Sequence, residues 1–153
     1  MDTSGTIAGV VAVLKAATTT NLDASTTRIY AGDWPATGVV DTISVWPATA
    51  VWTPIAIGTT DSDDITLHIQ LQMRNTDSTS QATHEAEFNR FLDFAEEIKV
   101  ALLSSTGRRV QDPVSSEYAY KLSAMSWTYG YATEDRQGAK ICLFEVTWKV
   151  PHV

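Results

Sequence analysis

The feature that most constrains this 153-residue chain is a run of alternating side chains over residues 65–74. Its apolar positions are Ile65, Leu67, Ile69, Leu71 and Met73, and its polar positions are Thr66, His68, Gln70, Gln72 and Arg74. A period of two is that of a β-strand, whose successive side chains point to opposite faces of a sheet. The run therefore predicts a half-buried strand, with one face toward the core and the other toward solvent or a partner.

Two segments have the periodicity of amphipathic helices. The first covers residues 4–18, with apolar side chains on one face and Thr3 or Ser4 as the N-cap. The second covers residues 80–104 and ends near Gly107, a residue type that favours helix termination. Its apolar face comprises Phe88, Phe91, Leu92, Ala95, Ile98 and Leu102.

Further strands are predicted at residues 28–31, 41–46, 50–57, 120–131 and 140–150. Pro47 either ends the 41–46 strand or places it at a sheet edge, because proline cannot donate to a strand ladder. The last two runs flank a polar turn and predict an antiparallel hairpin. The order α-β-β-β-β-α-β-β groups its strands, so we expect one α+β domain over residues 1–153. Two helices would pack on a mostly antiparallel or mixed sheet.

The charge balance disfavours tight binding to nucleic acid. The formal net charge is -7, and the nearest approach to a basic cluster is Arg108-Arg109, which is too small to hold a phosphate backbone. Only 19% of the residues are charged, which leaves surface for protein contacts. The single cysteine, Cys142, excludes an intramolecular disulfide and is expected to be buried. We see no signal peptide or membrane span and expect synthesis in the cytoplasm and no membrane partner.

The sequence predicts no enzyme site, cofactor or metal. His68, His84 and His152 share no metal-ligand spacing, and the acidic run 61–64 lacks the later positions of a calcium loop. The motifs of α/β-hydrolases, dinucleotide-binding folds and P-loops are also missing from the sequence.

Aromatic residues are the candidates for contact with other proteins. Five Trp and five Tyr occur in the chain, and several stand at predicted strand ends or loops. Aromatic side chains are enriched at protein interfaces. The predicted interface residues are Trp34, Trp46, Trp52, Tyr129 and Tyr131.

The order of elements resembles that of the tail terminator proteins of long-tailed bacteriophages. The resemblance begins with a short N-terminal helix followed by strands. It continues through the alternating run ITLHIQLQMR at 65–74, a polar connector, the helical run EAEFNRFLDFAEEIKVALL at 85–103 and two closing strands. It covers nearly the whole chain as a pattern, although the segment 31–58 is longer than in the shorter members.

The resemblance implies a structural role in the virion. Such proteins form a ring, usually of six subunits, that stops growth of the tail tube at its head-proximal end. The implied partners are further copies of the chain, the tail tube protein and a head-completion or connector protein. DNA would pass through the lumen without specific binding, and an acidic lumen would keep it from sticking. The family has no catalytic residues to carry over.

Three alternatives stay open. The chain could be another head–tail connector or tail completion protein of the same assembly. It could be a monomeric binding module with an apolar pocket lined by Trp46, Trp52 and Trp127. An enzyme would require His68 or His84 to converge with acidic residues in a cleft.

Overall fold

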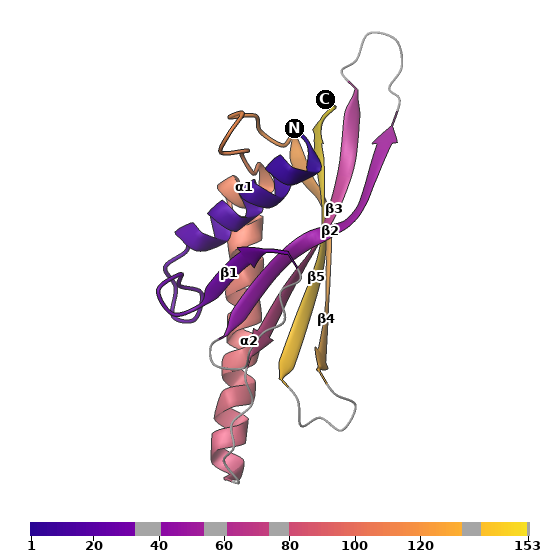
Figure 1. Ribbon diagram of the computed structural model, residues 1–153. Helices are drawn as coiled ribbons and strands as arrows, with labels where there is room; N and C mark the ends of the chain where they lie inside the picture. Colours follow the sequence, from indigo (N-terminus) through magenta and orange to yellow (C-terminus); the bar gives the residue numbers. More distant parts are fainter. Residues whose placement is uncertain (33–40, 54–60, 74–79, 133–138, 153) are drawn as a thin grey trace.

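A five-stranded sheet with helices on one face forms the molecule (Figure 1). The computed structural model describes residues 1–32, 41–53, 61–73, 80–132 and 139–152. The spatial order of the strands is β1-β2-β3-β5-β4. The elements are α1 (Thr3–Ala16), β1 (Arg28–Ala31), β2 (Thr42–Thr53), β3 (Ser62–Met73), α2 (Gln81–Leu103), α3 (Ser105–Arg108), β4 (Lys121–Tyr131) and β5 (Lys140–Pro151).

The predicted α+β class is confirmed. The sheet is mixed, because β1 runs parallel to β2 while the pairs β2–β3, β3–β5 and β4–β5 are antiparallel. A helix, a group of strands, a second long helix and two closing strands follow one another as predicted. The N-cap of α1 is Asp2, whose side chain accepts a hydrogen bond from the Gly5 backbone N–H at 2.7 Å. The N-cap prediction of Thr3 or Ser4 was therefore wrong by one or two residues.

β3 is the centre of the sheet and has the predicted two-faced character. Its five apolar side chains, Ile65 to Met73, are each at most 2% exposed. The partner strand β5 continues this face, since Leu67 lies opposite Val146 and Ile69 lies opposite Phe144. Phe94 and Ile98 of α2 belong to the same buried core. The alternating pattern thus identified the strand on which the core is built.

Pro47 does not end its strand, and among the described residues it has a strand neighbour on one side only, which agrees with the second of the two predicted alternatives. β2 is continuous through Pro47, so the predicted runs 41–46 and 50–57 belong to one strand as far as Thr53. Residues 54–57 lie outside the described part of the chain. The pairing of β1 with β2 reaches only to Val45, so Pro47 needs no N–H for a neighbour on that side. The register with β3 shifts just beyond it, as in a β-bulge.

Two glycines allow α1 to lie close to the segment that follows α3. A Cβ atom on Gly9 would stand 2.6 Å from the Gln111 carbonyl oxygen, and one on Gly5 would stand 2.5 Å from Asp112 Oδ2. Both distances are shorter than any ordinary contact, so a larger residue would push the helix away. This close approach fixes the position of α1 against residues 109–112.

We expect Gly9→Ala to destabilise the fold by about 1–3 kcal/mol, because the added methyl group meets fixed backbone. Chemical denaturation monitored by circular dichroism measures the loss. Gly130→Ala is the matched control, since a Cβ atom there meets nothing within 4 Å. Equal stability of the two variants would contradict the packing described here.

Candidate functional site

The predicted interface residues fall in different parts of the molecule. Trp34 lies outside the described residues. Trp46 lies on the sheet face away from the helices, with its ring edge against His68 at a centroid distance of 5.5 Å. Trp52 is 53% exposed, and its ring lies 6.1 Å from that of His152. Tyr129 and Tyr131 are two residues apart on β4, so they lie on the same face of the sheet; they are 48% and 39% exposed.

The strand register separates Trp52 from the two tyrosines. Trp52 is in line, through Asp63, with Val150 of β5, whereas Tyr131 lies opposite Lys140 of the same strand. Ten residues of extended chain span about 33 Å. The structure therefore brings Tyr129 and Tyr131 together and leaves Trp46 and Trp52 apart from them.

Exposed aromatic side chains gather where β4 meets α2. Trp127, Tyr129 and Tyr131 of β4 are called here the β4 aromatic surface; each is 39–48% exposed. The Tyr129 ring packs edge-on against Phe91 at 5.9 Å. β4 is the last strand of the sheet. Tyr129 and Trp127 therefore contact α2 on one side, and no described strand covers their other side. Sequence reasoning assigned Trp127 to a pocket and did not connect it with the tyrosines.

The first turns of α2 extend beyond the sheet (Figure 1). Within residues 81–90 every residue except Glu87 is exposed. The Lys140 ammonium group lies 3.9 Å from the Glu87 carboxylate, and Lys140 is opposite Tyr131, so α2 reaches the sheet at the end of β4. Phe88, predicted to lie on the buried helix face, is 45% exposed because its turn of the helix lies largely beyond the strands. This prediction was wrong.

The outer edge of β4 pairs with no other described strand. Its eleven residues, KLSAMSWTYGY, contain no proline and only one charged side chain, Lys121 at the start. A register shift between Leu122 and Ala124 disturbs one end of the strand alone. Unpaired N–H and C=O groups along such an edge are a template for pairing with another chain.

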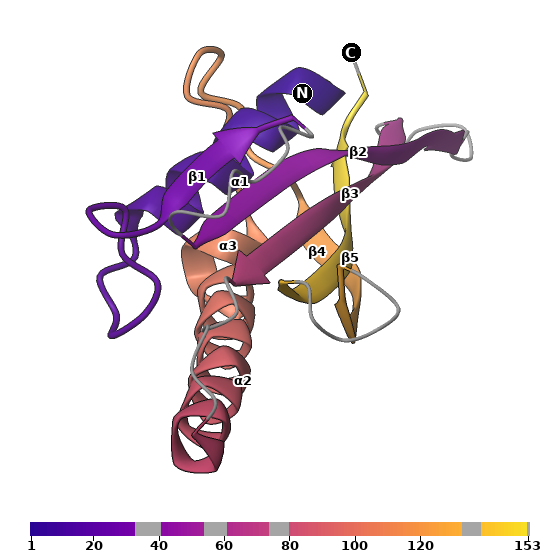
Figure 2. The ribbon, with the colours of Figure 1, turned by 60° about the horizontal axis from the view of Figure 1, so that its bottom comes forward.

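The sheet face away from the helices carries paired polar side chains. The hydroxyls of Thr66 and Thr147 are 2.8 Å apart, and His68 Nε2 lies 3.1 Å from Glu145 Oε2. Figure 2 turns the molecule to show the strands from another side. His68 therefore lies on an open strand surface, while His84 is on the exposed start of α2. Among the described residues His68 lies beside one carboxylate, that of Glu145, and neither His68 nor His84 is among the residues that line the groove between α1 and α3.

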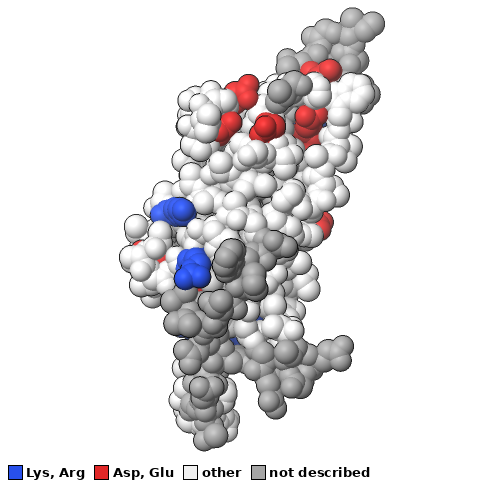
Figure 3. Space-filling view, in the orientation of Figure 1, with Lys and Arg blue, Asp and Glu red and all other residues white. Residues whose placement is uncertain are grey.

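The acidic run at the start of β3 is used in a hydrogen bond to His152 and an ion pair with Lys149. Asp63 Oδ1 lies 2.9 Å from His152 Nδ1, and Asp64 Oδ1 lies 3.3 Å from Lys149 Nζ. Among the described residues no group of three or more His, Cys, Asp or Glu side chains is placed to hold a metal ion. Figure 3 shows acidic side chains gathered at the end of the molecule that holds both termini.

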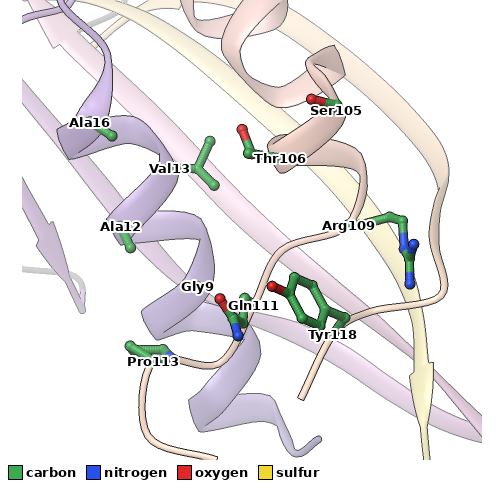
Figure 4. A pocket seen from close by; sticks show the side chains of 10 residues that line it. All are labelled: Gly9, Ala12, Val13, Ala16, Ser105, Thr106, Arg109, Gln111, Pro113 and Tyr118. Atoms are coloured by element: carbon green, nitrogen blue, oxygen red, sulfur yellow. The ribbon is translucent and has the colours of Figure 1, made fainter. Parts of the chain in front are cut away.

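A groove of about 560 Å³ lies between α1 and the segment around α3 (Figure 4). It is called here the α1 groove, and its lining residues are Gly9, Ala12, Val13, Ala16, Ser105, Thr106, Arg109, Gln111, Pro113 and Tyr118. The Arg109 guanidinium lies 5.7 Å from the centroid of the Tyr118 ring. None of Trp46, Trp52 and Trp127 lines this groove, and Trp46 and Trp127 are on opposite faces of the sheet.

The loop beside the groove is held by Asp112. Its carboxylate accepts hydrogen bonds from the Val114 backbone N–H at 2.8 Å and from the Ser115 hydroxyl at 2.7 Å. These bonds, the Val114 bond first, lower the pKa of the Asp112 carboxyl group below its usual value. An ionised Asp112 thus supports the wall formed by residues 111–118.

Comparison of the chain with models of known protein families gave no match, and comparison with curated proteins gave none either. Within the described ranges, no helix combines the length and the apolar character needed to cross a membrane.

Cys142 is fully buried, as predicted, and burial raises the pKa of its thiol to about 12. Only the thiolate is an effective nucleophile, so we expect negligible modification by a thiol reagent at mildly alkaline pH. Mass spectrometry after timed labelling measures the fraction of Cys142 that is modified. The same protein in guanidinium chloride should label fully. Rapid labelling of the folded chain would contradict the burial of Cys142.

Proposed function

We propose that this chain is a structural virion protein of the tail terminator type. It assembles as a ring at the head-proximal end of a tail tube, stops tube growth and offers a surface to head-completion or connector proteins. The observation that supports this best is the exposed aromatic surface beside the outer edge of β4, which pairs with no strand in the described part of the chain. Together they make one side of the molecule suited to contact with another protein.

The chemistry of this side favours a protein partner. Aromatic side chains that lie partly exposed on a rigid strand bury large area on contact at small entropic cost. Extended strand edges give additional backbone hydrogen bonds when a neighbour adds a strand. A net charge of -7 disfavours retention of DNA, in keeping with passage of DNA through a ring lumen.

The α1 groove favours a second candidate, a monomeric binding module. A groove of about 560 Å³ is within the size range of small-ligand sites. The two candidates differ in one observable property: the ring component must associate with itself, and the module need not.

The first experiment is native mass spectrometry over a wide range of protein concentration. We expect a concentration-dependent transition from monomer to a closed oligomer, with the hexamer as the largest abundant species. A chain that stays monomeric at every concentration would contradict the ring proposal and favour the binding module.

Charge placed on the β4 aromatic surface should block assembly. We expect the double variant Tyr129→Glu, Tyr131→Glu to remain monomeric at concentrations where the natural chain assembles, because two carboxylates would have to be buried without partners. Sedimentation velocity measures the species present, and circular dichroism checks the fold. Val100→Glu is the control, since Val100 is 59% exposed on α2 and does not belong to this surface.

Trp52→Glu tests the sequence-based interface candidate at the other end of the sheet. If Trp52→Glu blocks assembly and the tyrosine variant does not, the contact lies at that end of the β2–β3 pair.

A further inference from the structure

The α1 groove has a wall that a helix can approach closely and one cation at its rim. Ala12 and Ala16 supply small, exposed side chains from α1, and Ser105 and Thr106 lie across the groove from them (Figure 4). Arg109 is exposed, and no described carboxylate lies within ion-pair distance of it. Its guanidinium group lies over the Tyr118 ring. Although the protein has a net charge of -7, the charged residue that lines the groove, Arg109, is positive.

The start of α2 has the complementary character. Phe88 is 45% exposed and Glu85 is exposed, and their spacing of three places both on one side of the helix. Ser80 is the N-cap of the helix, and the side-chain amide of Gln81 donates a hydrogen bond to the Glu85 carboxylate at 2.8 Å. Local bonds of this kind stabilise a short helical end only marginally in water. A partner that covers Phe88 would therefore stabilise these helical turns.

We propose that, in the ring described above, the start of α2 from one copy occupies the α1 groove of the next copy. Phe88 packs over Ala12 and Ala16, and the Glu85 carboxylate pairs with the Arg109 guanidinium. This inference rests on the proposed function, because it assumes that the chain associates with itself.

The length of α2 makes this a contact between copies. Its 23 residues span about 34 Å, and the groove lies just after its C-terminal end, at Ser105 and Thr106. The start of the helix therefore cannot fold back into the groove of its own chain. Each copy supplies one helix end and one groove. In the proposed ring each helix end enters the groove of the next copy, head to tail, whereas a reciprocal exchange between two copies would give a closed dimer. Head-to-tail contacts close into a ring when the rotation between copies allows it.

Local charge favours a second copy as the occupant, because the exposed Glu85 at the helix end and the exposed Arg109 at the groove carry opposite charges. Copies with a net charge of -7 repel one another, and an Arg–carboxylate pair at the contact offsets part of this repulsion. The groove and the helix end are each exposed in the single chain, so neither needs to rearrange before they meet.

Charge reversal tests the pair. Arg109→Glu and Glu85→Arg should each raise the dissociation constant of the oligomer by about tenfold or more, since each places like charges together. The double variant should recover most of the natural affinity. Phe88→Ser should weaken assembly without affecting charge. Both charged side chains are exposed, so the variants are expected to fold, and thermal unfolding checks this.

Arg28→Glu serves as the matched control, because Arg28 is an exposed arginine on β1 and does not line the groove. Sedimentation equilibrium gives the dissociation constants. An oligomer unchanged by Arg109→Glu and Phe88→Ser would overturn this inference and leave the ring proposal standing. Weakening by both single reversals without recovery in the double variant would overturn the Glu85–Arg109 pair. A natural chain that never associates would overturn both proposals.

Discussion

The structure depends on the apolar face that β3 and β5 form together. Leu67, Ile69 and their β5 partners Val146 and Phe144 are completely buried, and α2 lies across them. Because β3 is paired on both sides, every other strand is placed by reference to it. β4 is placed last, at the edge, where α2 covers only part of its helix-side face. The stability of the centre and the exposure of β4 are thus two results of one arrangement.

Buried contacts distant in sequence complete this arrangement. Trp148 of β5 donates its indole N–H to the Gly107 carbonyl oxygen at 2.9 Å, which anchors α3 to the sheet. The bond is buried, so loss of the donor would leave a carbonyl without a partner. α1 is then fitted against the next residues by its glycines. The α1 groove exists because these two contacts hold its walls at a fixed separation.

Periodicity in the sequence predicted the parts of the fold that local pattern controls. The alternation of β3 and the apolar spacing of both long helices were sufficient to place the ends of these elements within three residues. Periodicity cannot say how far a neighbouring element extends, and for that reason Phe88 was predicted to be buried although its turn of α2 lies largely beyond the sheet. Arg109 and the small residues of α1 are about a hundred residues apart, so no local signal could reveal their groove. The interface roles of Trp46, Trp52, Tyr129 and Tyr131 remain predictions.

The β4 aromatic surface and the start of α2 lie at one end of the sheet, and the α1 groove lies beyond the other end of α2. Amide hydrogen exchange in the assembled and the dissociated protein tests most directly whether these surfaces form the contacts between copies. Assembly should slow exchange at residues 81–90 and along β4, because a neighbouring copy would hold the helical hydrogen bonds of the α2 start closed and would cover the β4 N–H groups that do not face β5. An assembled species in which both segments exchange as fast as in the monomer would contradict the proposed contacts.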